Sequence, residues 1–211
     1  MKWIEILKHR EKIKTKGIKI TKTKKKTISI IGASRKLGVT HICLSLANFI
    51  HSALKREVLY IELAEESQLL STVGEKQINF DGTVGFVFKG VTYILACDVE
   101  KALKLLNSHS GYIIVDIHNY DEKTKCIFER CDKRIVIGSM KPWCRRDLDI
   151  LVSKMKGVDD MGMNFYNKTT LKRENADFEK EFHRTMKTLP IIDNPFLIKE
   201  KEFKPLLEML M

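Results

Sequence analysis

A glycine loop between an apolar strand and an apolar helix constrains this chain more than any other feature. Residues 27–31 (TISII) are apolar or β-branched, which is typical of a short buried strand. Gly32 and Gly38 bound the turn that follows, and between Val39 and Leu54 apolar residues recur at helical spacing. In such a unit the unpaired N–H groups of the helix N-terminus point into the loop. The stretch therefore predicts a place where an anion can bind.

The loop has about the length of a Walker phosphate loop, whose last glycine is followed by a lysine and then by a serine or threonine. Here Val39 and Thr40 follow Gly38, so the hydroxyl is present and the lysine is missing. The lysine matters because its charge reaches the outer phosphates, whereas the hydroxyl serves the magnesium ion. A tight turn that packs a core helix and binds no ligand explains the loop equally well.

Length and composition bound the class of protein. A chain of 211 residues with 44% hydrophobic residues suits one α/β domain with a sizeable core. No apolar run approaches the roughly 18 residues of a membrane-spanning helix, and the charged N-terminus is unlike a signal peptide. Five scattered cysteines lack metal-binding spacing. We therefore expect a cytoplasmic protein, with peripheral association to a membrane left open.

The positive charge is concentrated at the N-terminus. Residues 1–26 hold eleven Lys or Arg and two Glu, which is +9 of the net +11, so residues 27–211 carry only +2. We expect a basic arm (1–26) followed by one domain (27–211). The arm has the charge to bind an anionic membrane, with Trp3 on the apolar side of a short helix, or the phosphates of DNA. A solvated tail, or a first strand around Ile18 and Ile20, explains the same lysines without a partner.

Downstream of the glycine loop, strand-like and helix-like runs alternate. This order predicts an α/β fold with a doubly wound, mostly parallel sheet flanked by helices. The expected strands are residues 27–31, 58–63, 83–88, 91–96, 112–117, 134–139, 161–166 and 188–192, of which 83–88 and 91–96 form a small hairpin. The expected helices are residues 39–54, 67–73, 99–109, one beginning at 122, one beginning at 142, 178–186 and 201–210, with a polar loop at 168–175.

Acidic residues lie at the ends of two of the most apolar strands. Glu62 and Glu65 lie at the end of VLYIEL and just beyond it, and Asp116 lies near the end of YIIVDI. The carboxyl ends of parallel strands carry the sites of doubly wound sheets, and Asp116 suits a Walker B carboxylate near magnesium. Solvated carboxylates that open the next helix, and an aspartate that caps the next turn, are the simpler alternatives.

Several segments together resemble the ParA/MinD family of P-loop proteins, whose deviant Walker loop is KGGxGKT. Laid on that loop, the chain has Ser34 at the signature lysine, Val39 at the Walker lysine and Thr40 at the magnesium hydroxyl. VLYIEL resembles the family's second strand, with Glu62 at its first aspartate and Ala64 at the aspartate associated with positioning the attacking water. Further resemblances are YIIVD to the Walker B strand, with Asp116 kept, MNFYNK to the asparagine-ended strand near the base, and LPIIDNPF to the final strand.

The resemblance covers about residues 27–211 and implies an ancestral ATP site. The cofactor-binding positions that it implies are Gly32, Ser34, Arg35, Lys36, Leu37, Gly38, Val39, Thr40, His41 and Asn164. Where nucleotide binds, Thr40 and Asp116 are the implied magnesium ligands, and Glu62 and Glu65 are candidates to orient water. The expected cofactor is ATP or ADP with magnesium, or no nucleotide at all.

Loss of both family lysines and of the water-positioning aspartate predicts a pseudo-ATPase. Such a protein binds nucleotide weakly or not at all and acts as a localisation or assembly factor, and the resemblance is to atypical relatives in pilus, secretion or partition machinery. One alternative is a slow ATPase in which Arg35 or Lys36 supplies the lost charge, and another is a partition-like protein that binds DNA non-specifically. Protein partners are expected, and a homodimer across the loop face is left open.

Overall fold

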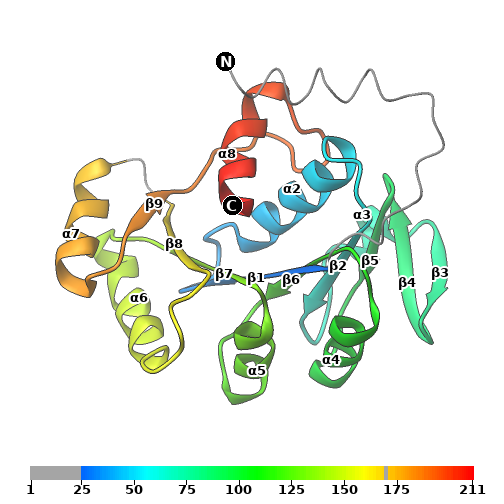
Figure 1. The fold of residues 1–211 in the computed structure, drawn as a ribbon, viewed down its shortest axis with the longest axis horizontal. Coiled ribbons are helices and arrows are strands. Elements are labelled where there is room, and N and C mark those ends of the chain that lie inside the picture. The colour runs from blue at the N-terminus through cyan, green and yellow to red at the C-terminus, as the bar shows by residue number, and fades with distance from the viewer. Residues whose placement is uncertain (1–24, 169–170) are drawn as a thin grey trace.

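The computed structural model describes residues 25–168 and 171–211, and in this part of the chain one open sheet is flanked by helices (Figure 1). The sheet order is β3-β4-β5-β2-β6-β1-β7-β8-β9. The strands are β1 (Lys26–Gly32), β2 (Val58–Leu63), β3 (Gln77–Phe80), β4 (Thr83–Phe88), β5 (Val91–Ile94), β6 (Tyr112–Ile117), β7 (Lys133–Gly138), β8 (Met163–Asn167) and β9 (Met186–Thr188). The helices are α2 (Val39–Ser52), α3 (Leu70–Val73), α4 (Val99–Ser108), α5 (Glu122–Arg130), α6 (Pro142–Lys154), α7 (Lys172–Phe182) and α8 (Glu200–Leu210).

The sheet is parallel except at one edge. From β5 through β2, β6, β1, β7 and β8 to β9 every pair is parallel, and only β3, β4 and β5 pair antiparallel. This confirms the expected mostly parallel α/β sheet and the hairpin at residues 83–96. The glycine-loop strand β1 lies between β6 and β7, so the loop leaves the centre of the sheet.

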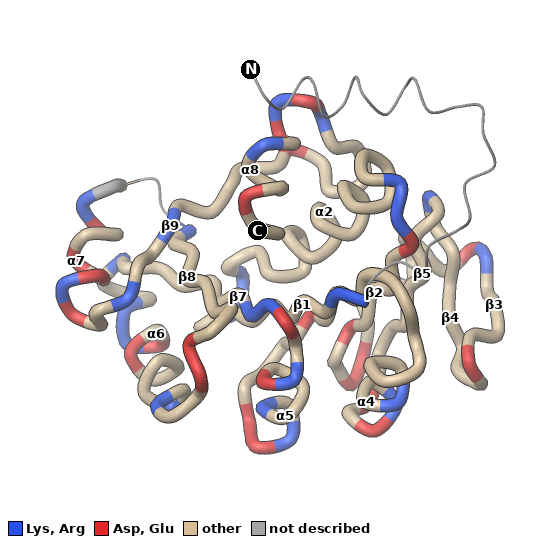
Figure 2. The backbone as a smooth tube through the Cα atoms, viewed as in Figure 1, with Lys and Arg blue, Asp and Glu red and all other residues tan. Residues whose placement is uncertain are grey.

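Helices cover both faces of the sheet, with α2 and α8 on one face and α4, α5 and α6 on the other (Figure 1). Alternate residues of β6 enter the two cores: Ile114 packs with α2 and α8, whereas Ile113 packs with α4, α5 and α6. Because both faces are covered, β2 and β7 are buried along their whole length. Helix α2 lacks Lys, Arg, Asp and Glu, as Figure 2 shows, which suits its burial between the sheet and α8.

The first strand of the sheet is tied to distant parts of the chain. Strand β1 already includes Lys26, whose ammonium donates to the backbone oxygen of Leu210 at 2.8 Å. Thr27 is held by Asp132, which accepts from both its backbone N–H and its hydroxyl, at 2.7 and 2.8 Å. The arm at residues 1–24, including the alternative strand around Ile18 and Ile20, lies outside the described residues. Within residues 25–168 and 171–211, no helix combines the length and the apolar character that crossing a membrane requires.

Three expected elements differ in the structure, and one strand was not expected. The helix expected at 67–73 is reduced to α3, and β3 was not expected at all. Helix α7 begins inside the expected polar loop at 168–175 and ends before residue 186, and β9 lies mostly before the strand expected at 188–192. Helix α7 was misplaced because its sequence, KRENADFEKEF, has too few apolar residues to show a helical period. Strand β9 was misplaced because its three residues are defined by pairing with β8.

Candidate functional site

The glycine loop is shaped by a close contact between its two ends. A Cβ atom on Gly32 would lie 2.7 Å from Cγ2 of Val39, so only glycine lets the first residue of α2 approach this closely. Gly38 has φ 91° and Lys36 has φ 65°, both in the left-handed region, which glycine adopts without strain. Leu37 between them is buried in the core under α2. The loop is therefore anchored by Leu37 and Val39, and it turns through two left-handed residues.

The N-terminus of α2 offers unoccupied backbone donors. Gly38 is the N-cap, no side chain caps the helix, and its first turn has no acidic residue. The first N–H groups of a helix have no partner within it, and they carry a partial positive charge. The arrangement suits an anion, as the sequence predicts.

A lysine from a distant part of the chain reaches this loop. Lys168, directly after β8, donates from its ammonium to the backbone oxygen of Lys36 at 2.7 Å. The same nitrogen would lie 3.7 Å from a Cβ atom on Gly38. Lys168 thus places a positive charge beside the loop, and sequence reasoning missed it because 132 residues separate the two partners.

The other predicted loop residues take different positions. Arg35 and Lys36 are exposed, whereas Ser34 and Thr40 are half-buried. His41 turns away from the loop, with Nε2 2.8 Å from the backbone oxygen of Ile192. Its ring therefore ties α2 to the segment that precedes α8.

Two carboxylates lie side by side next to the loop strand. The register of β2 with β6 pairs Glu62 with Asp116, and β6 in turn pairs Asp116 with Ile30 of β1. The side chain of Asp116 is 0% exposed and that of Glu62 is 3% exposed. The hydroxyl of Tyr60 donates to Oδ2 of Asp116 at 2.8 Å. Two acidic groups are thus buried together on the face that α2 covers.

His118 completes this cluster. Its Nε2 lies 3.6 Å from Oε1 of Glu62 and 3.8 Å from Oδ2 of Asp116, and its side chain is 38% exposed. The interaction with Asp116 raises the pKa of His118 above its ordinary 6.5, partial burial opposes this, and the negative charge of Glu62 adds to it. Sequence reasoning missed His118, and the available signal was its position just after β6, two residues beyond Asp116.

The buried charge affects the groups around it. Burial raises the pKa of Glu62, a hydrogen bond with Ser67 opposes this in part, and the neighbouring charge of Asp116 raises it further. The pKa of the Tyr60 hydroxyl and that of the Cys43 thiol in α2 are also raised, first by burial and then by the charge of Asp116. Each of these groups is therefore held in its protonated form more firmly than in water.

The residues present fit part of a nucleotide–magnesium site. Oδ1 of Asp116 and Oε2 of Glu62 are buried and have no hydrogen-bond partner among the described residues, which suits carboxylates facing a cation. The helix N-terminus suits a phosphate. Neither Ser34 nor Val39 carries a positive charge, so neither side chain can supply a cation to a phosphate. The buried carboxylates therefore suit a cation, whereas the loop is incomplete as a nucleotide site.

An open pocket of about 390 Å³ lies beside the loop. It is lined by residues 32–35, by residues 118–120 after β6, and by Asp147, Ile150, Leu151 and Lys154 of α6. Arg35 and His118 both face it, and the charge of Arg35 lowers the pKa of His118. The carboxylate cluster is thus reached from the pocket through the half-exposed ring of His118.

Two predicted site residues lie apart from this group. Glu65 is exposed two residues beyond the end of β2. Asn164 is the second residue of β8, and its amide donates to the backbone oxygen of Gly162 at 3.3 Å. The asparagine at the loop end of β8 is Asn167, which donates to Glu174 at 3.2 Å and to Asn175 at 2.9 Å.

Comparison with known proteins identifies the fold. No protein-family model and no curated protein matches the chain. A plasmid partition protein from Borrelia burgdorferi bound to AMPPNP is 15% identical, with a TM-score of 0.64 over 89% of this chain and 98% of that one. A ParA family ATPase from Chlorobium tepidum is 15% identical, with a TM-score of 0.63 over 90% of each chain. The septum site-determining protein MinD from Pyrococcus horikoshii, complexed with Mg-ADP, is 14% identical, with a TM-score of 0.56 over 88% of this chain and 86% of that one. The protein has the fold of the ParA/MinD P-loop ATPases.

Proposed function

We propose that this chain is a degenerate ParA/MinD-like P-loop protein that binds nucleotide weakly or not at all, lacks efficient ATP turnover, and acts as a localisation or assembly factor through its surfaces. The observation that carries the proposal is the position of Val39. Its side chain packs on Gly32 and on the core under α2, at the position where the family resemblance places the Walker lysine. An apolar anchor replaces the charge that a phosphate loop needs.

The size of the loss supports a protein without turnover. Removing one preorganised donor to a developing negative charge costs about 2.7–4 kcal/mol, or roughly a hundredfold to a thousandfold in rate. Here valine and serine stand at both lysine positions, and Ala64 stands where the family has its water-positioning aspartate. Losses of this size at three positions leave little catalysis even where nucleotide still binds.

A second candidate function, slow hydrolysis of bound ATP, is favoured by Lys168. Its ammonium already lies beside the loop, on the backbone oxygen of Lys36. A phosphate at the N-terminus of α2 would compete with that oxygen for the ammonium, and Lys168 would then supply part of the missing charge. Arg35 and Lys36, the cations within the loop itself, are exposed.

Nucleotide affinity decides between the two candidates. A fluorescent ATP analogue with magnesium is titrated against the wild-type protein, Val39→Lys, and Val39→Met as a control of similar length without charge. We expect no saturation of the wild type up to about 1 mM, which corresponds to roughly −4 kcal/mol. One charge-assisted hydrogen bond adds about 1.5–3 kcal/mol, so Val39→Lys should bind at least tenfold more tightly and Val39→Met should not.

Micromolar binding by the wild type would contradict the first candidate. In that case Lys168→Met distinguishes the origin of the affinity. Weakening by tenfold or more would support the second candidate, in which Lys168 acts as the loop cation. Unchanged affinity would assign the binding to backbone donors of the loop and reject that role for Lys168.

A further inference from the structure

We propose that Glu62, Asp116 and His118 form a binding site for one divalent transition-metal ion, such as Zn²⁺ or Co²⁺, and that this site needs no nucleotide. The ligand atoms of the three side chains all lie within 4.8 Å of one another, the one such group among the described residues. Nε2 of His118 is 3.6 Å from Glu62 and 3.8 Å from Asp116. Ligand atoms on a tetrahedral zinc ion at its usual bond lengths lie about 3.4 Å apart, so both distances from His118 are within a few tenths of an ångström of that spacing.

One unsatisfied oxygen on each of the two carboxylates indicates that a ligand belongs beside them. Asp116 is 0% exposed and its Oδ1 has no hydrogen-bond partner among the described residues. Glu62 is 3% exposed, and its Oε2 also has no hydrogen-bond partner among the described residues. Buried polar atoms without a partner are rare, since each costs free energy unless a donor or an ion satisfies it.

The charge of the cluster also fits a divalent ion. Two carboxylates are buried next to each other, and His118 is the only basic side chain within 4 Å of either in the described part of the chain. A singly charged imidazolium compensates one of the two negative charges. A divalent cation compensates both, and it leaves His118 as a neutral ligand.

The donor set favours a transition metal over magnesium. Magnesium prefers an all-oxygen shell with several waters, whereas imidazole with carboxylates suits zinc, cobalt and similar ions. Tyr60 fixes the orientation of Asp116 by donating to its Oδ2 at 2.8 Å, as outer-shell partners of metal ligands do. The half-exposed ring of His118 opens to the pocket beside the loop, which gives the ion a path and a position for a water ligand.

The test uses tag-free, full-length protein, freed of metal with a chelator and titrated with Co²⁺ in the absence of nucleotide. Visible absorption reports the coordination of the ion. We expect one equivalent to bind with the bands of a four- or five-coordinate nitrogen and oxygen site. His118→Gln should lose the bands and weaken binding by at least tenfold. Tyr60→Phe, which keeps all three ligands, should weaken it about tenfold.

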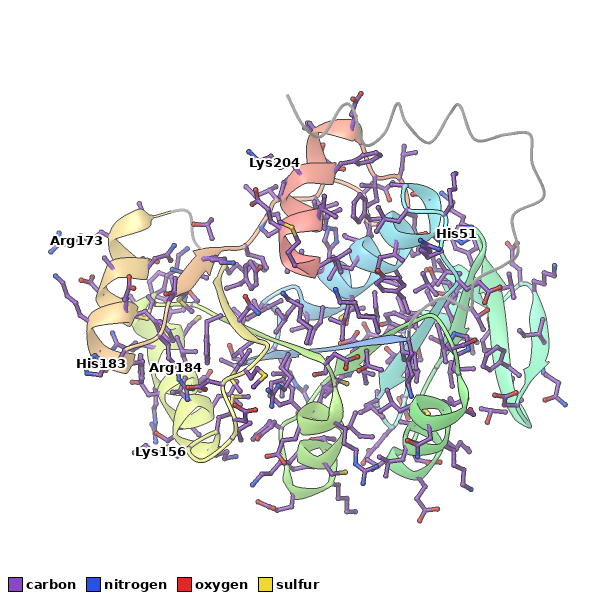
Figure 3. The ribbon with its side chains drawn as sticks, in the orientation of Figure 1. His51, Lys156, Arg173, His183, Arg184 and Lys204 are labelled. Carbon is purple, nitrogen blue, oxygen red and sulfur yellow. The ribbon has the colours of Figure 1, made fainter. Side chains whose placement is uncertain are left out.

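Matched variants keep the result independent of folding. His183→Gln removes an imidazole at the end of α7, at the edge of the fold (Figure 3), and should bind Co²⁺ as the wild type does. Far-ultraviolet circular dichroism in the presence of chelator checks that each variant is folded. Zn²⁺ should raise the unfolding temperature of the wild type and of His183→Gln, but not that of His118→Gln, because an ion that binds only the folded state stabilises it.

Three results would overturn the proposal. These are the absence of a stoichiometric Co²⁺ complex, binding that survives His118→Gln unchanged, and binding that appears only when ATP is added. The last would assign the ion to the nucleotide. The proposal does not rest on the absence of ATP turnover, because the titration contains no nucleotide.

Discussion

The hydrogen bond between Tyr60 and Asp116 gives a sharp test of the buried cluster. Tyr60→Phe removes one oxygen and keeps the ring, which packs against Tyr93 with ring centroids 5.2 Å apart. The lost bond is 2.8 Å long, and its acceptor is 0% exposed. Because Oδ1 already lacks a partner among the described residues, the substitution leaves both oxygens of Asp116 without a hydroxyl donor.

The magnitude follows from the kind of bond. A hydrogen bond to a charged group contributes about 1.5–3 kcal/mol, whereas a bond between neutral groups contributes about 0.5–1.5 kcal/mol. We expect Tyr60→Phe to lower the free energy of unfolding by about 1.5–3 kcal/mol at neutral pH. The measurement is urea unfolding in the presence of chelator, followed by circular dichroism. The slope of the unfolding free energy against urea concentration should be the same for wild type and variant.

Tyr93→Phe is the matched control, because among the described residues its hydroxyl meets only the neutral amide of Asn48, at 3.4 Å. It should cost less than about 1 kcal/mol. In an Asp116→Asn background the effect of Tyr60→Phe should shrink, since the acceptor is no longer charged. The reasoning would be refuted if Tyr60→Phe and Tyr93→Phe lowered the free energy of unfolding equally. It would also be refuted if Tyr60→Phe cost as much in the Asp116→Asn background as in the wild type.

Three further predictions concern other parts of the molecule. Deleting residues 1–24 removes nine Lys or Arg and two Glu, a net charge of +7, and leaves β1 complete. Co-sedimentation with DNA or anionic liposomes should be lost, whereas circular dichroism should be unchanged. Equal binding by the truncated protein would contradict this. Asp121→Ala removes the side chain that caps α5, in a capping box with Thr124, and should cost about 1 kcal/mol at neutral pH. Backbone hydrogen bonds lower the pKa of Asp121 below 3.8, so the cap stabilises the protein above pH 3.8 and this stabilisation is lost as the pH falls through the lowered pKa. The stabilities of wild type and variant should therefore converge in acid unfolding curves. A constant difference between them would argue against the cap. Any dimer across the loop face should form equally with and without ATP in analytical ultracentrifugation. The proposed resemblance places Ser34 at the family's signature lysine, and a serine is too short to reach a partner's phosphates. A dimer driven by ATP would contradict this.

Strong periodicity made most of the fold predictable from sequence. The buried strands β1, β2, β6 and β7 and the apolar helix α2 were expected within one or two residues of their bounds. Helix α7 was misplaced because its eleven residues are mostly charged, and only Phe178 and Phe182 mark its inner side. Strand β9 depends on its partner β8, which no local pattern reveals.

The site was predictable only where it lies in one continuous segment. The loop residues 32–40 and the strand-end Asp116 could be found from sequence, because a phosphate loop and an acidic strand end are local patterns. The pairing of Glu62 with Asp116 requires the register of β2 with β6. His118 and Lys168 belong to no local motif. His118 meets the carboxylates, and Lys168 meets the loop, only in the folded chain.

Phosphate release from ATP and magnesium by purified full-length protein tests the proposed loss of ATPase function most directly. Asp116→Asn, prepared in the same way, measures release by contaminants, because it removes the carboxylate expected beside the metal. We expect the wild type to release phosphate no faster than Asp116→Asn, since the uncharged Val39 stands where the proposed resemblance places the loop lysine. Turnover by the wild type that rises to saturation with ATP and disappears in Asp116→Asn would show a working ATPase and contradict the account.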